Sequence, residues 1–168
     1  MAGIAQFSIS GMAVWCLREA LETDDEKQTV ALLPLALTWI SHCRHNLLTH
    51  SIRRHSYSMV PLTLAPLIVP GVMARRADVD QDGLSMKRWL FWRRRLQTLS
   101  CSKDPRVSGD AWDGFMNMIS CGRDLNFTVE GEAAFAEALQ KATDKALAAG
   151  ETRGMKVDDI EIKVGWFY

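Results

Sequence analysis

The sequence of 168 residues lacks the short motifs that identify many enzymes. It has no Gly-rich phosphate loop, no G-x-S-x-G elbow, no H-E-x-x-H zinc motif and no C-x-x-C pair. These absences exclude enzymes that depend on one of these four motifs, but not a catalytic site assembled from distant residues. We therefore predict no catalytic, cofactor-binding or metal-binding residue, and we favour a non-enzymatic protein over an enzyme.

Cysteine is scarce, and the four cysteines are far apart in the chain. The N-terminal stretch MAGIAQFSIS has no basic residues before an apolar run, which argues against a secretory signal. Both features favour free, mostly buried thiols in a reducing compartment inside the cell. We expect a cytoplasmic protein, although a nuclear protein would show the same features. The cysteines are Cys16, Cys43, Cys101 and Cys121.

Net charge is also lacking, because 20 basic residues balance 20 acidic residues. The charges are nevertheless segregated: residues 1–42 carry a net charge of −3, residues 43–95 of +7 and residues 96–168 of −4. A basic centre between acidic ends can bind a polyanion, or it can neutralise its own neighbours. We favour internal neutralisation.

Apolar residues at helical spacing recur along most of the chain. They predict an all-α, single-domain bundle of about four to five helices over residues 1–168. The expected helices cover residues 11–23 and 29–45, the stretch from Ser85 to the SCSKDP segment, residues 112–119, and most of residues 129–150. Beyond them, Ile160, Ile162 and Val164 alternate with charged residues, which predicts an extended tail or an edge segment.

Local signals refine these helices. The segment around Pro34 is apolar nearly all round, so we expect a buried helix that starts or kinks at this proline. Gly122 and Gly150 are expected to cap the last two helices. We predict that the core is built around five tryptophans: Trp15, Trp39, Trp89, Trp92 and Trp112.

The helix that follows Ser85 carries both tryptophans and arginines, in the stretch KRWLFWRRR. Aromatic and basic residues together can serve single-stranded nucleic acid. However, Trp89 and Trp92 share a helical stripe with Leu96 and Leu99, which places Arg93 and Arg94 on the solvated side. Buried tryptophans with solvated arginines are the simpler interpretation, so we do not expect nucleic-acid binding.

The stretch DVDQDG resembles the first half of a calcium loop. Asp78, Asp80, Asp82 and Gly83 match the first six positions of an EF-hand. The twelfth position, which needs a bidentate glutamate, is Trp89. We therefore expect a solvated turn that leads to an N-cap at Ser85, and no calcium site.

All four histidines lie with Cys43 inside fourteen residues. A zinc site needs four converging ligands, usually in two close pairs. Three arginines lie among these side chains and would repel a dication. Surface histidines are therefore the expected interpretation of His42, His45, His50 and His55.

Three segments together resemble a protein family from filamentous fungi, which is known only as a domain of unknown function (number thirty-six thirty-two). They are a W-x-L-R-E-A-L-E helix, a helix ending in W-I, and G-L-S-x-x-R-W-x-F-W-x-x-R-L. The resemblance covers about half of the chain and implies a helical fold and a fungal source, but no activity. It rests on Trp15, Leu17, Arg18, Ala20, Leu21, Glu22, Trp39, Gly83, Leu84, Ser85, Arg88, Trp89, Phe91, Trp92, Arg95 and Leu96.

Residues 46–80 depart from that family pattern, which has a short link at this place. The stretch contains three of the five prolines and shows no helical period. A long connection of this kind is unusual in a compact domain. We interpret it as an irregular insertion or as retained intron sequence, with a slight preference for the second, and we expect it to pack poorly.

Residues 56–74 carry no charged side chain, and this length just reaches a membrane span. Pro61, Pro66 and Pro70 would interrupt the hydrogen bonds of such a helix three times. We therefore do not expect a membrane span.

Two functions remain for a chain of this kind. The first is a non-enzymatic helical module that binds another protein, whose identity and stoichiometry the sequence does not give. The second is a ligand-binding or catalytic helical domain with a pocket lined by tryptophans. Converging polar groups in such a pocket would favour the second function.

Overall fold

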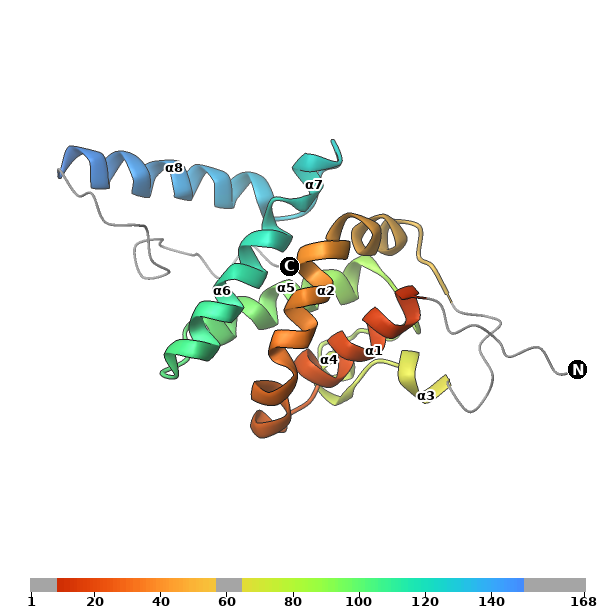
Figure 1. Cartoon of the computed structure of the whole chain (residues 1–168). Coiled ribbons are helices and arrows are strands. Elements are labelled where there is room, and N and C mark those ends of the chain that lie inside the picture. The colour runs from red at the N-terminus through yellow and green to blue at the C-terminus, as the bar shows by residue number, and fades with distance from the viewer. Residues whose placement is uncertain (1–8, 57–64, 150–168) are drawn as a thin grey trace, which may run out of the picture. The chain divides into compact units, whose positions relative to one another are not determined.

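The computed structural model describes residues 9–56 and 65–149, and in these ranges the chain forms helices and no strands (Figure 1). Five of the helices have 13 residues or more. The prediction of an all-α fold with four to five main helices is confirmed. The elements are α1 (Ile9–Leu21), α2 (Glu26–Ile52), α3 (Ala65–Ile68), α4 (Val72–Arg76), α5 (Met86–Ser100), α6 (Pro105–Ile119), α7 (Cys121–Asp124) and α8 (Glu132–Ala148).

The chain divides into two compact units, Met1–Met118 and Ile119–Tyr168. In the first unit, α1 packs against α2, α3 and α5, and α2 packs against α5. In the second unit, the Glu132 carboxylate at the start of α8 accepts hydrogen bonds from the backbone N–H groups of Gly122 and Arg123. That both units form one domain stays a prediction, and the predicted C-terminal tail and the cap at Gly150 lie outside the described residues.

Helix α2 is longer than its apolar segment predicts. It begins after Asp25, whose carboxylate accepts hydrogen bonds from the backbone N–H groups of Lys27 and Gln28. Pro34 therefore lies inside the helix and does not start it. The kink at Pro34 stays a prediction. The expectation of a buried helix is wrong for one face, because Val30 and Leu35 remain 46% and 44% exposed.

The core is built around two of the five predicted tryptophans. Trp89 and Trp92 on α5 are fully buried, whereas Trp15, Trp39 and Trp112 are half-buried. Apolar side chains of α1, including Val14 and Leu17, complete the packing. Burying a large aromatic side chain on one helix stripe supplies much of the stabilisation of a small domain.

Helix α5 starts where the sequence predicts, because the Ser85 hydroxyl accepts a hydrogen bond of 3.2 Å from the backbone N–H of Arg88. The prediction that Arg93 is solvated is wrong, since its side chain is fully buried. Arg93 follows Trp89 by four residues, which places both on one side of a helix. Arg94 is exposed as expected.

The predicted poor packing of residues 46–80 is wrong for the described part of this stretch. Residues 46–52 continue α2, and α3 and α4 follow in the same stretch. Five apolar residues of this stretch enter the core: Leu47, Leu48, Ile68, Ala74 and Val79. Whether the stretch is an insertion or retained intron sequence stays a prediction.

Helix α6 is longer than predicted. It begins at Pro105, which suits the first helical position, and the Asp104 carboxylate accepts a hydrogen bond of 3.0 Å from the backbone N–H of Arg106. Gly122 does not cap it but lies inside α7. On α8, the predicted face has Phe135 buried, while Leu139, Ala142 and Ala146 are half-buried.

Candidate functional site

Two of the sequence motifs meet at a buried group of polar side chains between α1 and α5. Glu22 follows the last residue of α1, and Arg88 and Trp92 lie one turn apart on α5. All three side chains are fully buried. We call this group, together with the backbone of residues 68–71 and Gly83 that it binds, the clasp.

Arg88 uses every N–H group of its guanidinium in the clasp. Its Nε lies 2.6 Å from Glu22 Oε1, and its Nη2 lies 3.1 Å from Glu22 Oε2. Nη1 donates to the carbonyl oxygens of Ile68 (2.6 Å) and Gly83 (2.8 Å), and Nη2 also donates to that of Val69 (3.5 Å). A guanidinium has five N–H groups, so none is left for a ligand.

The Glu22 carboxylate is equally occupied. Besides Arg88, its Oε1 accepts a hydrogen bond of 2.6 Å from Trp92 Nε1, and its Oε2 accepts one from the backbone N–H of Gly71. These four donors match the roughly four lone-pair positions of a carboxylate. The Arg88 guanidinium carbon also lies 5.4 Å from the Trp92 ring centroid, close enough for a cation–π contact.

The clasp fixes the backbone of residues 68–73 against the end of α1. The Glu22 carbonyl accepts a hydrogen bond of 3.0 Å from the Met73 N–H, and Arg18 Nε donates to the Val69 carbonyl at 2.8 Å. At Gly71, an added Cβ would lie 2.6 Å from Glu22 Cβ. This approach leaves no room for a larger residue.

The chemistry of the clasp is therefore structural. Catalysis requires a group that can reach substrate, and ligand binding requires a free donor or acceptor. Neither condition is met by Glu22 or Arg88, because burial excludes solvent and the fold itself occupies their hydrogen-bonding groups. A buried pair of this kind costs free energy in desolvation, which the surrounding hydrogen bonds offset.

The segregated charges of the sequence meet in part in the first unit. The ion pairs Arg88–Glu22 and Arg76–Asp24 (3.3 Å) each join the basic centre to the acidic N-terminal region. Among the pairs that the structure describes, these two agree with the expected internal neutralisation. The exposed Arg76–Asp24 pair contributes little to stability.

The DVDQDG stretch forms the turn between α4 and α5. Asp78, Asp80 and Asp82 are exposed, while Val79 between them is buried. The N–H of Gly83 donates to the Ile68 carbonyl, and Gly83 has a φ of 79°, which suits glycine. Within residues 9–56 and 65–149, no three His, Cys, Asp or Glu side chains are grouped to hold a metal ion.

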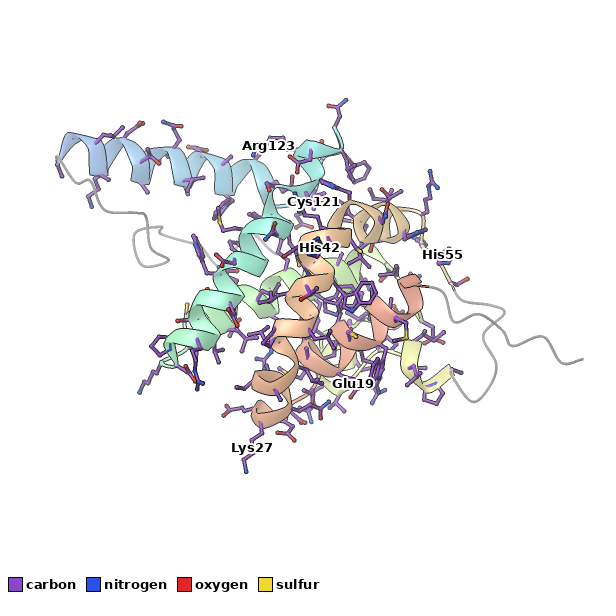
Figure 2. The ribbon with its side chains drawn as sticks, viewed as in Figure 1. Glu19, Lys27, His42, His55, Cys121 and Arg123 are labelled. Atoms are coloured by element: carbon purple, nitrogen blue, oxygen red, sulfur yellow. The ribbon has the colours of Figure 1, made fainter. Side chains whose placement is uncertain are left out.

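The histidines lie along the second half of α2 and beyond its end, as Figure 2 shows for His42 and His55. The rings of His50 and His55 lie 4.9 Å apart. Burial lowers the pKa of His50, and the nearby His55 and Arg53 lower it further. The other two histidines are not part of this pair.

The cysteines are all free thiols, as the sequence predicts. Cys16 and Cys121 are buried, Cys43 is half-buried and Cys101 is exposed. Burial raises the pKa of Cys16, and a hydrogen bond between its side chain and Trp39 partly opposes this effect.

A band of small and apolar residues on α2 faces solvent. Val30 and Leu35 are its largest members, and residues 28–43 contain no charged side chain. Figure 2 shows Lys27 and His42, which lie at the two ends of this band. We call Val30, Ala31, Pro34, Leu35 and Thr38, all of them exposed, the α2 stripe.

No helix among the described residues is long and apolar enough to cross a membrane. The family model described as "Protein of unknown function (DUF3632)" matches residues 1–96. This range contains α1 to α4 and α5 as far as Leu96, and with them every residue of the clasp. No curated protein and no solved structure matches the chain.

Proposed function

The chain belongs to the DUF3632 family, and we propose that it is a non-enzymatic helical module that binds another protein inside the cell. The family match covers both halves of the clasp, so the part of the chain that the family shares is built around a closed polar core. The fungal source that the sequence resemblance implies is part of the same proposal.

The α2 stripe is the observation that carries this proposal. Two large apolar side chains, Val30 and Leu35, are nearly half exposed on a helix whose opposite face is fully buried. Scattered apolar residues on a surface need no explanation, but a continuous uncharged band of them is typical of interaction sites. The half-buried Trp39 widens the band toward α1, and aromatic side chains are enriched in interfaces.

The clasp supports the non-enzymatic part of the proposal. Glu22 and Arg88 form the only oppositely charged pair among the described residues in which both side chains are fully buried. The hydrogen-bonding groups of both are used within the fold. The alternative of a tryptophan-lined pocket stays a prediction. Trp92 donates its indole N–H to Glu22, so this donor is used within the fold.

Affinity enrichment from an extract of the source cells tests the interaction. The bait is the full chain, and the comparison is the double variant Val30→Glu/Leu35→Glu. A matched control, Leu125→Glu/Leu147→Glu, adds two carboxylates at exposed apolar positions elsewhere. We expect that a partner protein is enriched equally by the wild type and the control, and at least tenfold less by the stripe variant. The purified partner should also bind the wild-type chain in calorimetry.

Equal retention by the stripe variant would remove the support that α2 gives. If the wild-type chain catalyses a reaction that a folded Glu22 or Arg88 variant no longer catalyses, the purely structural role of the clasp is contradicted. Circular dichroism of every variant establishes that the helices are intact before either result is interpreted.

A further inference from the structure

The C-terminal end of α2 carries two arginines that the fold does not pair. Arg53 is the C-cap of α2 and Arg54 follows it, and both side chains are exposed. Within the described residues, neither arginine takes part in an ion pair. The sequence has no acidic residue between Glu26 and Asp78. Because the helix dipole supplies only about half a negative charge at this end, it does not balance two guanidinium groups.

An exposed serine follows these arginines directly after the helix. Ser56 lies three residues after Arg53 and two after Arg54, and it is the only serine or threonine in the sequence with arginine at both places. Among the described residues its hydroxyl makes no hydrogen bond, so the hydroxyl is available for reaction. One broad class of serine/threonine kinases, the basophilic kinases, binds arginines at these two places with carboxylates of its substrate groove. A carboxylate suits this purpose because it can accept two parallel hydrogen bonds from one guanidinium.

From this arrangement we propose that Ser56 is a phosphorylation site for a basophilic protein kinase that recognises Arg53 and Arg54. In the transfer, a bond forms between Ser56 Oγ and the γ-phosphorus of ATP, and the bond from this phosphorus to the oxygen that bridges it to the β-phosphate breaks. ADP leaves, and the hydroxyl proton passes to the catalytic aspartate of the kinase. This proposal is independent of the α2 stripe and of the interaction function.

The backbone at this end of α2 favours the local opening that a kinase requires. Kinases hold their substrates in an extended conformation, so residues 53–56 must leave the helix end. This end is closed by hydrogen bonds from the His55 N–H to the His50 carbonyl (3.0 Å) and from the Arg54 N–H to the Ser51 carbonyl (3.2 Å). Such a helix end usually has glycine where Arg54 stands, because the residue there is left-handed, and Arg54 has a φ of 51°. Unwinding relieves this strain, so we expect the end to open more readily than one with glycine.

Thr98 shows what distinguishes Ser56 from a residue that merely follows an arginine. Thr98 has Arg95 three residues before it and an exposed side chain. It lies inside α5, however, and its hydroxyl donates a hydrogen bond of 3.1 Å to the Arg94 carbonyl. The kinase would have to unwind this core helix to reach it. We therefore expect no phosphate on Thr98 in the folded chain.

Phosphorylation would change the sign balance at the end of α2. A phosphoserine carries a charge of about −1.5 to −2 at neutral pH, which offsets the two arginines almost completely. The phosphate oxygens are also strong acceptors for guanidinium N–H groups. The modification would therefore convert a positively charged helix end into a nearly neutral one.

The catalytic subunit of cAMP-dependent protein kinase, which is basophilic, tests the proposal on the purified full chain with ATP. We expect one phosphate per chain, located on Ser56 by mass spectrometry, and loss of this incorporation in Ser56→Ala. Arg53→Gln/Arg54→Gln keeps the serine but should lower the initial rate at least about tenfold, because it removes the charge-assisted hydrogen bonds to the kinase. The matched control Arg75→Gln/Arg76→Gln removes two exposed arginines at the end of α4 and should react at the wild-type rate.

Three outcomes would overturn the proposal. The first is a wild-type chain that takes up no phosphate on Ser56. The second is a wild-type rate in Arg53→Gln/Arg54→Gln, since the arginines would then not direct the kinase. The third is equal phosphorylation of Thr98, which would mean that the kinase acts on unfolded chains. Circular dichroism before the reaction establishes that the helices of each variant are intact.

Discussion

Replacing Glu22 by glutamine isolates the contribution of the charge in the clasp. The amide keeps the shape of the side chain but offers one carbonyl oxygen to the four donors that now reach the carboxylate. About two of these donors lose their acceptor, at about 1–3 kcal/mol each. Arg88 also becomes a buried cation without a counter-ion. We therefore expect Glu22→Gln to lower the free energy of unfolding by about 3–5 kcal/mol.

The pairing itself is measured with a double-mutant cycle. Arg88→Met should cost a similar amount, because it leaves Glu22 without its counter-ion and the Gly83 carbonyl without a donor, and it removes one of the two donors to the Ile68 carbonyl. The double variant should cost at least about 1 kcal/mol less than the sum, since neither charge remains to be unpaired. Arg94→Met, on the exposed side of α5, is the control and should cost under about 0.5 kcal/mol.

Urea unfolding followed by tryptophan fluorescence gives these free energies, since Trp89 and Trp92 are buried. A cost below about 1 kcal/mol for Glu22→Gln, or costs that simply add in the cycle, would refute the clasp as described. A typical domain has only about 5–15 kcal/mol of stability. The single variants should therefore shift the urea midpoint far more than the control.

Three further predictions concern other sites. Gly71→Ala should destabilise the fold by about 1–3 kcal/mol in the same assay, because its Cβ would lie 2.6 Å from Glu22 Cβ. The pKa of His50 is lower in the folded chain than its ordinary 6.5, so its stabilising contribution is present above that pH and is lost as the pH falls below it. In thermal melts, the variant His50→Gln should lose less stability than the wild type as the pH falls below 6.5. Cys101 should react with a thiol reagent well before Cys16, whose burial raises its pKa; the reverse order, followed by mass spectrometry, would be inconsistent with the structure.

The helices could largely be predicted from the sequence because their signals are local. Ser85 is a good N-cap, and the stripe from Trp89 to Leu96 has the helical spacing of a buried face. Gly122 shows where such signals fail. A glycine after an apolar run suggests a C-cap, but here it accommodates the close approach of the Glu132 carboxylate and continues into α7.

The clasp could not be predicted in this way because its partners are 66 residues apart in the chain. The signal was present in part: both charged residues fall inside the recognised motifs, next to buried apolar positions. What the pattern does not contain is the third participant, the backbone of residues 68–71. That segment shows no apolar period in the sequence. It takes part through its backbone carbonyl groups, which every residue carries, and so its sequence gives no signal of this role. The buried Arg93 was missed although it follows Trp89 by four residues, because its charge favoured solvent over the side of α5 that it shares with that tryptophan.

The central claim is that the clasp locks residues 68–71 to the core, and hydrogen exchange at the Gly71 amide tests it most directly. This N–H donates to the buried Glu22 carboxylate. We predict that it exchanges only through global unfolding, so that its exchange free energy equals the free energy from urea unfolding and falls with it in Glu22→Gln. Exchange of Gly71 through a local opening several kcal/mol below the global value would contradict the claim.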